Sequence, residues 1–206
     1  AIKELPPSIG SLPRLESVFL RSRKNLRELP NSLLMLQNLS TFDLGGIQTH
    51  GRESLKRLMQ ESQPAFSYTN LEHLDLENCG LLDEDLYLTL NCFQHVRELN
   101  LPRNDFVSLP ECIKECAKLK KLDVTNCKRL RDIPKLPSKL EDIRAENCTS
   151  LSTESLGNLW SQAKNCVCLG IAAPATTFPD WFDHYCKGGT LSFRVRDKNF
   201  PRVIAI

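Results

Sequence analysis

A leucine frame recurs along this chain and constrains its fold more than any other feature. The frame Leu-x-x-Leu-x-Leu, with other apolar residues allowed at its fixed positions, occurs six times in 206 residues. The copies begin at Leu15, Leu39, Leu71, Val96, Leu119 and Leu140, at intervals of 24, 32, 25, 23 and 21 residues. A repeat of this length cannot bury its apolar side alone, so stacked neighbours must supply the core. The chain is therefore predicted to form a solenoid.

Each repeat carries a second mark three residues beyond the frame, where the chain turns after a predicted strand. The residues at this turn position are Arg23, Ile47, Cys79, Asn104, Cys127 and Cys148. Asn donates hydrogen bonds to backbone carbonyls and Cys does so more weakly, so four of the six copies can bond neighbouring coils. The frame, the turn position and the period together are typical of leucine-rich repeats.

The return half of the repeat is marked by proline. Leu-Pro or Ile-Pro pairs occur at Leu5-Pro6, Leu29-Pro30, Leu109-Pro110 and Ile133-Pro134. Proline removes a backbone donor and stiffens the segment, which favours an irregular or 3-10 conformation. The predicted fold class is α/β, a leucine-rich-repeat solenoid with a curved parallel sheet and an irregular or 3-10 convex side.

The longest interval between frames contains an insertion at about residues 45–70. Within it Leu55, Leu58 and Met59 have helical spacing. This pattern predicts a short amphipathic helix over residues 53–62. Such a helix either covers the core or serves as a dedicated partner-binding element, and the apolar stripe favours the first interpretation.

The leucine frame stops after residue 151 and the pattern changes. Residues 152–165 have helical spacing and are predicted to be a junction. Residues 166–206 then alternate apolar and polar side chains, most regularly over Leu191–Val195, and are predicted to be the N-terminal part of a β-rich post-repeat domain. Three or four strands do not close a sandwich. We therefore expect a truncated β-sandwich segment after the repeats of residues 1–151.

Charge and composition exclude several classes of function. The 27 basic and 25 acidic residues leave a net charge of +2, which provides no long-range attraction to nucleic acid or membrane. No apolar run approaches the ~20 residues of a membrane helix. The nine cysteines are an odd number and several occupy the turn position. Both features favour reduced, buried thiols in a cytoplasmic or nucleocytoplasmic protein.

Catalytic and metal sites find little support in the sequence. No nucleophile motif and no phosphate-binding loop is present, so no catalytic residue and no cofactor is predicted, and the chain is not expected to be an enzyme. Cys166, Cys168, His184 and Cys186 could together supply four zinc ligands. Their Cys-x-Cys and His-x-Cys spacing is unusual for zinc, and buried thiols are the preferred interpretation.

Three segments together resemble the C-terminal part of a family of plant intracellular immune receptors. They are the Glu-Leu-Pro return segments, the string Ile133–Leu151 that closes the repeats, and Phe178–Val195. The last is similar to the opening of a jelly-roll or immunoglobulin-like domain that follows the repeats. The family combines a Toll/interleukin-1-receptor domain, a nucleotide-binding domain and leucine-rich repeats (TIR-NB-LRR).

The resemblance implies recognition without catalysis. In that family the repeats and the post-repeat domain recognise a pathogen effector or a guarded host protein, and they hold the nucleotide-binding domain inactive. The NAD-cleaving Toll-type domain is absent from this sequence. The resemblance also makes Asp180, Asp183, His184 and Lys187 candidate partner contacts, with ordinary solvated turn residues as the alternative.

The register of the repeats identifies side chains that point out of the predicted strands. The candidate partner contacts among them are Phe19, Arg21, Asp43, His73, Asp75, Glu77, Glu98, Asn100, Lys121, Asp123, Arg144 and Glu146. Over all outward positions seven side chains are acidic and three are basic, a net charge of −4. A basic patch on a protein partner is therefore favoured, and neither Asp75 nor Asp123 is expected to support the core.

An extracellular leucine-rich-repeat ligand-binding domain is the alternative function. It would carry cysteine-paired caps and a Gly-x-Ile-Pro return motif, which this sequence lacks. It would also use the glycosylation sequons at Asn38 and Asn147. Because Ala1 lies in the middle of the repeat pattern, we expect the true N-terminus to lie upstream.

Overall fold

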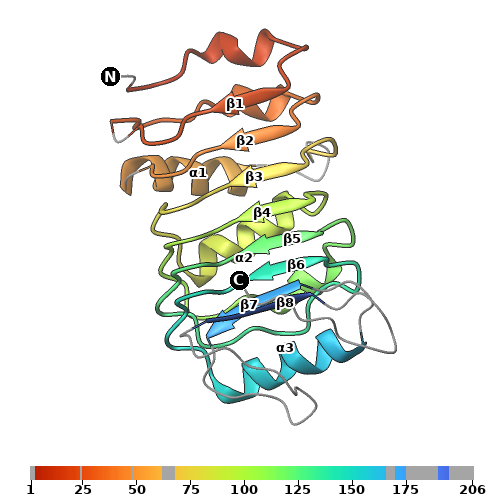
Figure 1. Ribbon diagram of the computed structural model, residues 1–206. Helices are drawn as coiled ribbons and strands as arrows, with labels where there is room; N and C mark the ends of the chain where they lie inside the picture. The colour runs from red at the N-terminus through yellow and green to blue at the C-terminus, as the bar shows by residue number, and fades with distance from the viewer. Residues whose placement is uncertain are drawn as a thin grey trace.

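The computed structural model describes residues 3–23, 25–47, 49–61, 68–165, 170–174 and 190–194. Six short parallel strands stack in chain order and confirm the predicted register of the leucine frame. They are β1 (Ser17–Phe19), β2 (Thr41–Asp43), β3 (His73–Asp75), β4 (Glu98–Asn100), β5 (Lys121–Asp123) and β6 (Asp142–Arg144). Figure 1 shows them as one layer, with the helices on the return side of the coils.

The return side is built of both 3-10 segments and α-helices. The 3-10 segments η1 (Pro7–Ser11), η2 (Asn31–Met35) and η4 (Glu111–Glu115) each begin directly after a proline or at one, as the proline pairs predict. The insertion forms α1 (Thr49–Glu61), which begins one turn earlier than the predicted helix. Leu55, Leu58 and Met59 are buried, so α1 covers the core.

A second return helix, α2 (Asp83–Cys92), was not predicted from the sequence. Its first turn is acidic, which suits a helix N-terminus, and the carboxylate of Asp85 accepts the N–H of Leu82. The buried Asp85 also lies 3.2 Å from Arg52 of α1, and Lys56 of α1 bonds Glu84 at 2.5 Å. These charge pairs and the apolar contact between α1 and α2 attach the insertion to the next coil.

The turn position builds a ladder of buried hydrogen bonds inside the solenoid. Asn104 donates to the carbonyls of Leu76 and Leu101, both at 2.9 Å, and accepts the N–H groups of Cys79 and Leu81. One side chain thus bonds four buried backbone groups, of which the carbonyl of Leu101 also accepts the thiol of Cys127.

Three cysteines repeat this bond in weaker form. The thiols of Cys79, Cys127 and Cys148 each donate to a carbonyl of the preceding coil, at 3.4, 3.2 and 3.1 Å. Burial raises the pKa of all three thiols to about 12, which keeps them protonated and able to donate. In the first two coils Ile47 is buried without such a bond and Arg23 is exposed, because a guanidinium is too costly to bury unpaired.

The sheet continues past the last leucine frame. As predicted, the junction is helical, with α3 over Thr153–Asn165 and Leu156, Leu159 and Trp160 buried. The chain then adds β7 (Gly170–Pro174), which pairs in parallel with β6, and β8 (Thr190–Arg194), which pairs antiparallel with β7. The predicted second domain therefore contributes strands to the same sheet as the repeats. The start of this second domain at residue 166 stays a prediction.

Candidate functional site

The outward side chains of β1 to β6, together with those of the turn residues that follow each strand, form one continuous surface, called the strand face below. All twelve contacts predicted on the strands lie there. Paired residues align across the sheet, for example Phe19 opposite Asp43 and Asp75 opposite Asn100. Because side chains alternate along a strand, residues at one register position share this face.

Arg21 ties three neighbouring coils together at the N-terminal end of the strand face. Its guanidinium donates to Asp43 at 3.0 Å, to Asp75, and to Glu77 at 2.5 Å. Hydrogen bonds from Arg21 to Glu77 and Asp43 raise the pKa of the guanidinium further above its usual value. Three carboxylates that would repel one another are therefore held around one cation.

A glycine makes this reach possible. Gly45 occupies the coil position between Arg21 and Glu77, and a Cβ at Gly45 would lie only 3.2 Å from Cζ of Arg21. The guanidinium therefore passes over the second coil where a side chain is missing. Arg103, in the turn after β4, bonds the other oxygen of Glu77 at 3.2 Å.

The aspartates of the strand face also hold the backbone. The Oδ1 atoms of Asp43, Asp75 and Asp123 accept the N–H groups two residues further on, at 3.0, 2.9 and 2.8 Å. Asp75 and Asp123 therefore each hold the turn after their strand, a role outside the core that the sequence did not indicate. Partial burial raises the pKa of Asp75 despite the nearby cation, which shows that desolvation of this carboxylate outweighs its attraction to Arg21.

The middle of the strand face carries a smaller network around Glu98. Lys121 bonds Glu98 at 2.6 Å, and Nδ1 of His73 lies 3.0 Å from its other oxygen. The hydrogen bond from Lys121 lowers the pKa of Glu98 below its usual range. A negative charge at Glu98 is thus compensated inside the molecule.

The C-terminal end of the strand face is different. Glu146 accepts a hydrogen bond from the hydroxyl of Thr125 at 2.9 Å. Within the described part of the chain, neither Glu146 nor Asp123 forms an ion pair. In the same region Arg144 is 60% exposed and bonds only Asp142, its neighbour on the strand, at 3.3 Å. Two carboxylates that form no ion pair, and the guanidinium of Arg144 on the strand position opposite Asp123, are available here to a partner.

The charge estimate for the strand face needs one correction. Arg103 bonds Glu77 at this face although it lies one residue past Pro102, which occupies the outward register position after β4. It adopts a left-handed backbone conformation with φ 58°. Seven carboxylates face four cations, a net charge of −3, and most of them are paired with one another. The uncompensated negative charge is concentrated at Asp123 and Glu146.

Phe19 is the one predicted contact on the strand face that has an exposed apolar side chain. It is 65% exposed on β1, beside the carboxylate of Asp43 on the adjacent strand. An exposed aromatic ring flanked by charged groups is a common anchor in protein interfaces.

Other predicted sites fall outside the described residues. These include the loop contacts Asp180, Asp183, His184 and Lys187, and the cysteine-histidine set considered for zinc. Among the described residues no group of three or more His, Cys, Asp or Glu side chains is arranged to hold a metal ion. Within the same residues, no helix has the length and apolar character needed to cross a membrane.

Comparisons with known proteins confirm the predicted family. Residues 1–170 match the family described as "Disease resistance protein RPS4B-like, leucine-rich repeats". The chain is 30% identical to TMV resistance protein N of Nicotiana glutinosa over 159 residues, which cover 69% of this chain and 14% of that protein. It is 29% identical to disease resistance protein RPS4B of Arabidopsis thaliana over 168 residues, which cover 80% of this chain and 13% of that protein.

The chain thus spans about one seventh of the relatives that it matches. Among solved structures, a leucine-rich-repeat protein of Leptospira interrogans aligns with 20% identity and a TM-score of 0.42, covering 80% of this chain and 51% of that one. Because this score is low, the fold assignment rests on the strand register and the buried frame described above.

Proposed function

This chain belongs to the leucine-rich-repeat family of RPS4B-like disease resistance proteins, and we propose that it is the recognition module of a plant immune receptor of the TIR-NB-LRR class. In this proposal the strand face binds a pathogen effector or a guarded host protein. The observation that carries it is the open end of that face, where Asp123 and Glu146 have no cation of their own among the described residues.

The partner chemistry follows from the charges. A lysine or arginine of the partner can approach Asp123 and Glu146 without displacing a resident cation. Charge complementarity of this kind steers association and excludes acidic partners. The polar side chains of Asn100 and Thr125 lie beside these carboxylates in the register of the sheet and can supply hydrogen bonds. A partner with a basic patch is therefore favoured over an acidic one.

The other end of the face would contribute an apolar anchor. Phe19 stands beside Arg21, whose guanidinium is already fixed by three carboxylates. A fixed neighbour loses little conformational entropy when a partner binds. Phe19 would thus add apolar contact at a preorganised surface.

Two finer parts of the proposal concern the whole receptor. The module would also contribute to autoinhibition through contact with the receptor's nucleotide-binding domain, and it would act in the cytoplasm or nucleus. The protonated, buried thiols of Cys79, Cys127 and Cys148 support a reducing compartment. Asn38 also uses its amide nitrogen to bond the carbonyl of Pro13 at 2.7 Å, which gives this sequon a structural role without a glycan.

The test is a change of charge at the open end in the full-length receptor. Asp123→Asn, which keeps an Oδ1 acceptor for the N–H of Thr125, combined with Glu146→Lys should abolish the response to the effector that triggers the receptor, with normal accumulation. The matched control is Glu111→Gln with Glu115→Lys, two exposed acidic positions on the return side, which should respond normally. A full response from the strand-face variant would remove the open end from the recognition surface. The same plants, scored without effector, test autoinhibition, because a constitutive response would indicate its loss.

A further inference from the structure

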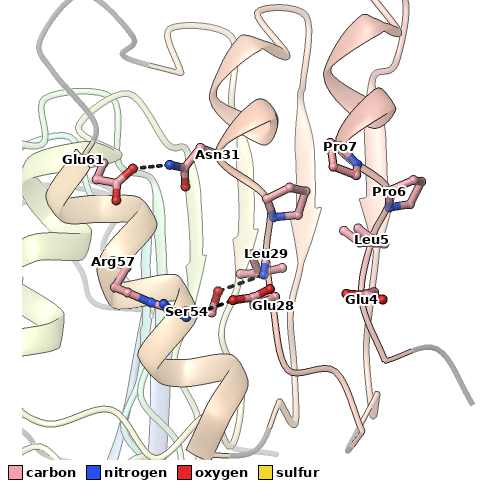
Figure 2. Close-up of a pocket in the computed structure, with 11 residues that line it drawn as sticks. Glu4, Leu5, Pro6, Pro7, Glu28, Leu29, Asn31, Ser54, Arg57 and Glu61 are labelled. Carbon is pink, nitrogen blue, oxygen red and sulfur yellow. Dashed lines mark hydrogen bonds and ion pairs between the residues drawn. The ribbon is translucent and has the colours of Figure 1, made fainter.

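A groove crosses the return side of the first coils, far from the strand face. It has a volume of about 640 Å³ and lies between the return segments at Glu4–Pro7 and Glu28–Asn31 and the exposed side of α1. Figure 2 shows Arg57 and Glu61 reaching from α1 toward the second segment, with Glu4 to Pro7 on the opposite side. We call it the return groove.

The groove exists because neighbouring coils have return segments of different width. Helix α1 is wider than the extended and 3-10 segments beside it, so the return side has a step. The floor of this step includes the apolar side chains of Leu5, Pro6 and Pro30, and the two prolines have no N–H. The N–H of Leu29 is bonded to the buried hydroxyl of Ser54 at 2.8 Å. The floor therefore offers apolar surface with its backbone donors already satisfied or absent.

The same construction occurs a second time in the chain. There the N–H of Ile133, which also precedes a proline, bonds the hydroxyl of Ser155 in α3 at 3.1 Å. Isolated parallel bridges join the return segments at both places, Glu4 with Glu28 and Ser108 with Asp132. The return side thus contains two steps that share the serine-to-backbone hydrogen bond and the isolated bridge but are surrounded by different side chains.

The side chains that surround the two steps differ in charge. Aligning Ser54 with Ser155 sets Arg57 against Asn158 and Glu61 against Gln162. The bridge residues Glu4 and Glu28 likewise correspond to Ser108 and Asp132. The second step is built with a single charged residue at these four positions, so the four charges of the return groove are not required by the fold.

The charges of the return groove are also poorly compensated. The bridge sets Glu4 and Glu28 side by side, an arrangement in which like charges repel. The cation nearest to Glu28 is Arg57, at 3.7 Å, and both side chains are about 60% exposed. Glu61 bonds the neutral amide of Asn31. Three carboxylates and one loosely held guanidinium give the lining of this groove a net charge of −2, and Lys3 and Arg27 line the adjoining hollow on the other side of Glu4 and Glu28.

We propose that the return groove docks an extended peptide segment of a protein partner, with basic residues alternating with apolar ones. A lysine or arginine of the segment lies between Glu4 and Glu28 and relieves their repulsion. The alternate apolar side chains pack on Pro6 and Pro30. An extended segment matches this arrangement, since its apolar side chains point to the floor while its long basic side chains bend from the other side to the exposed carboxylates at the rim. This surface is separate from the strand face, and the proposal does not depend on the function assigned to that face.

Fluorescence anisotropy with labelled octapeptides tests the proposal on the whole chain. The probes alternate leucine with arginine, with serine or with glutamate. The arginine probe should bind at least tenfold more tightly than the glutamate probe, with the serine probe between them. Glu4→Gln, Glu28→Gln and Glu61→Gln together should weaken the arginine probe at least fivefold. Glutamine keeps the shape of each side chain, and Glu61→Gln still provides an acceptor for Asn31.

Two further variants separate this groove from other acidic surfaces. Arg57→Asn, the residue found at the equivalent position of the second step, removes the resident cation and should tighten binding of the arginine probe two- to fivefold. Asp123→Asn with Glu146→Gln on the strand face should change it less than twofold. Equal loss in the strand-face variant, unchanged binding in the groove variant, or no detectable binding of the arginine probe would overturn the proposal.

Discussion

The two halves of the solenoid are held together in different places. In coils one to three the polar cross-links lie outside, on the strand face, where Arg21 joins carboxylates of β2 and β3 and of the turn after β3. The turn position there holds the exposed Arg23 and the apolar Ile47. In coils three to six interior cross-links are added through Asn104 and the cysteines of the turn position, and the strand face carries only the smaller network at Glu98 and the bond from Thr125 to Glu146.

This difference has a consequence for recognition. The outward charged side chains that hold the first half together already form ion pairs with one another. A partner must therefore break these ion pairs or bind beside them. In the second half interior bonds also join the coils, and Asp123 and Glu146 form no ion pair within the described residues. Two surfaces with the same register and similar composition thus differ in what they offer a partner.

Removing the strongest interior cross-link should have the largest effect. Asn104→Ala removes the partner of the N–H groups of Cys79 and Leu81 and of the carbonyl of Leu76, and each such buried group costs about 1–3 kcal/mol. We expect a loss of roughly 3 kcal/mol or more in the free energy of unfolding, measured by urea denaturation. Cys127→Ala, which removes one weak bond, is the control and should cost about 1 kcal/mol. Similar values for the two variants would contradict the interior account.

Removing the exterior cross-link should have the next largest effect. Arg21→Ala leaves three adjacent carboxylates without their shared cation, and we expect a loss of about 1–2 kcal/mol at low salt. Because Arg21 is 45% exposed, the loss should shrink in 1 M NaCl, where the Debye length is about 3 Å. Arg144→Ala breaks a single exposed pair and should cost less than about 0.5 kcal/mol. A salt-independent loss at Arg21 would show that packing, not charge, is responsible.

A double-mutant cycle tests whether Gly45 acts through Arg21. Gly45 has no positive φ, so its backbone accepts a side chain. Gly45→Val should cost about 0.5–1 kcal/mol by displacing the guanidinium, and nearly nothing when Arg21 is already Ala. Thermal unfolding of the two single variants and the double variant measures the coupling. Additive losses would mean that Gly45 serves a purpose other than the passage of Arg21.

The smallest predicted effect concerns pH. Lys121 lowers the folded-state pKa of Glu98 below its unfolded value, so this carboxylate stabilises the fold above the unfolded pKa and stops doing so as pH falls through the folded pKa. Glu98→Gln should therefore cost up to about 0.5 kcal/mol at pH 7 and nothing at pH 2. Denaturant midpoints at both pH values check this. A constant difference between the two would exclude the proposed ionic cause.

Sequence reasoning succeeded where the signal was periodic and local. The leucine frame located all six strands because each fixed leucine must face the core of its own coil. Helix α2 was missed because Leu86 and Leu90 alone are a weak helical pattern between two frames. The network at Arg21 could not be foreseen, since it depends on a side chain reaching across two coils through the space at Gly45. The return groove likewise arises from the thickness of neighbouring coils, which no single repeat encodes.

The most direct test of the central claim is hydrogen–deuterium exchange of the full-length receptor with and without the protein that triggers it. The account predicts that binding slows exchange in peptides covering β4 to β6 and the turns after them, residues 98–147, more than in those covering β1 and β2. Slower exchange confined to the first two strands, or to the return side alone, would contradict the assignment of recognition to the open end of the strand face.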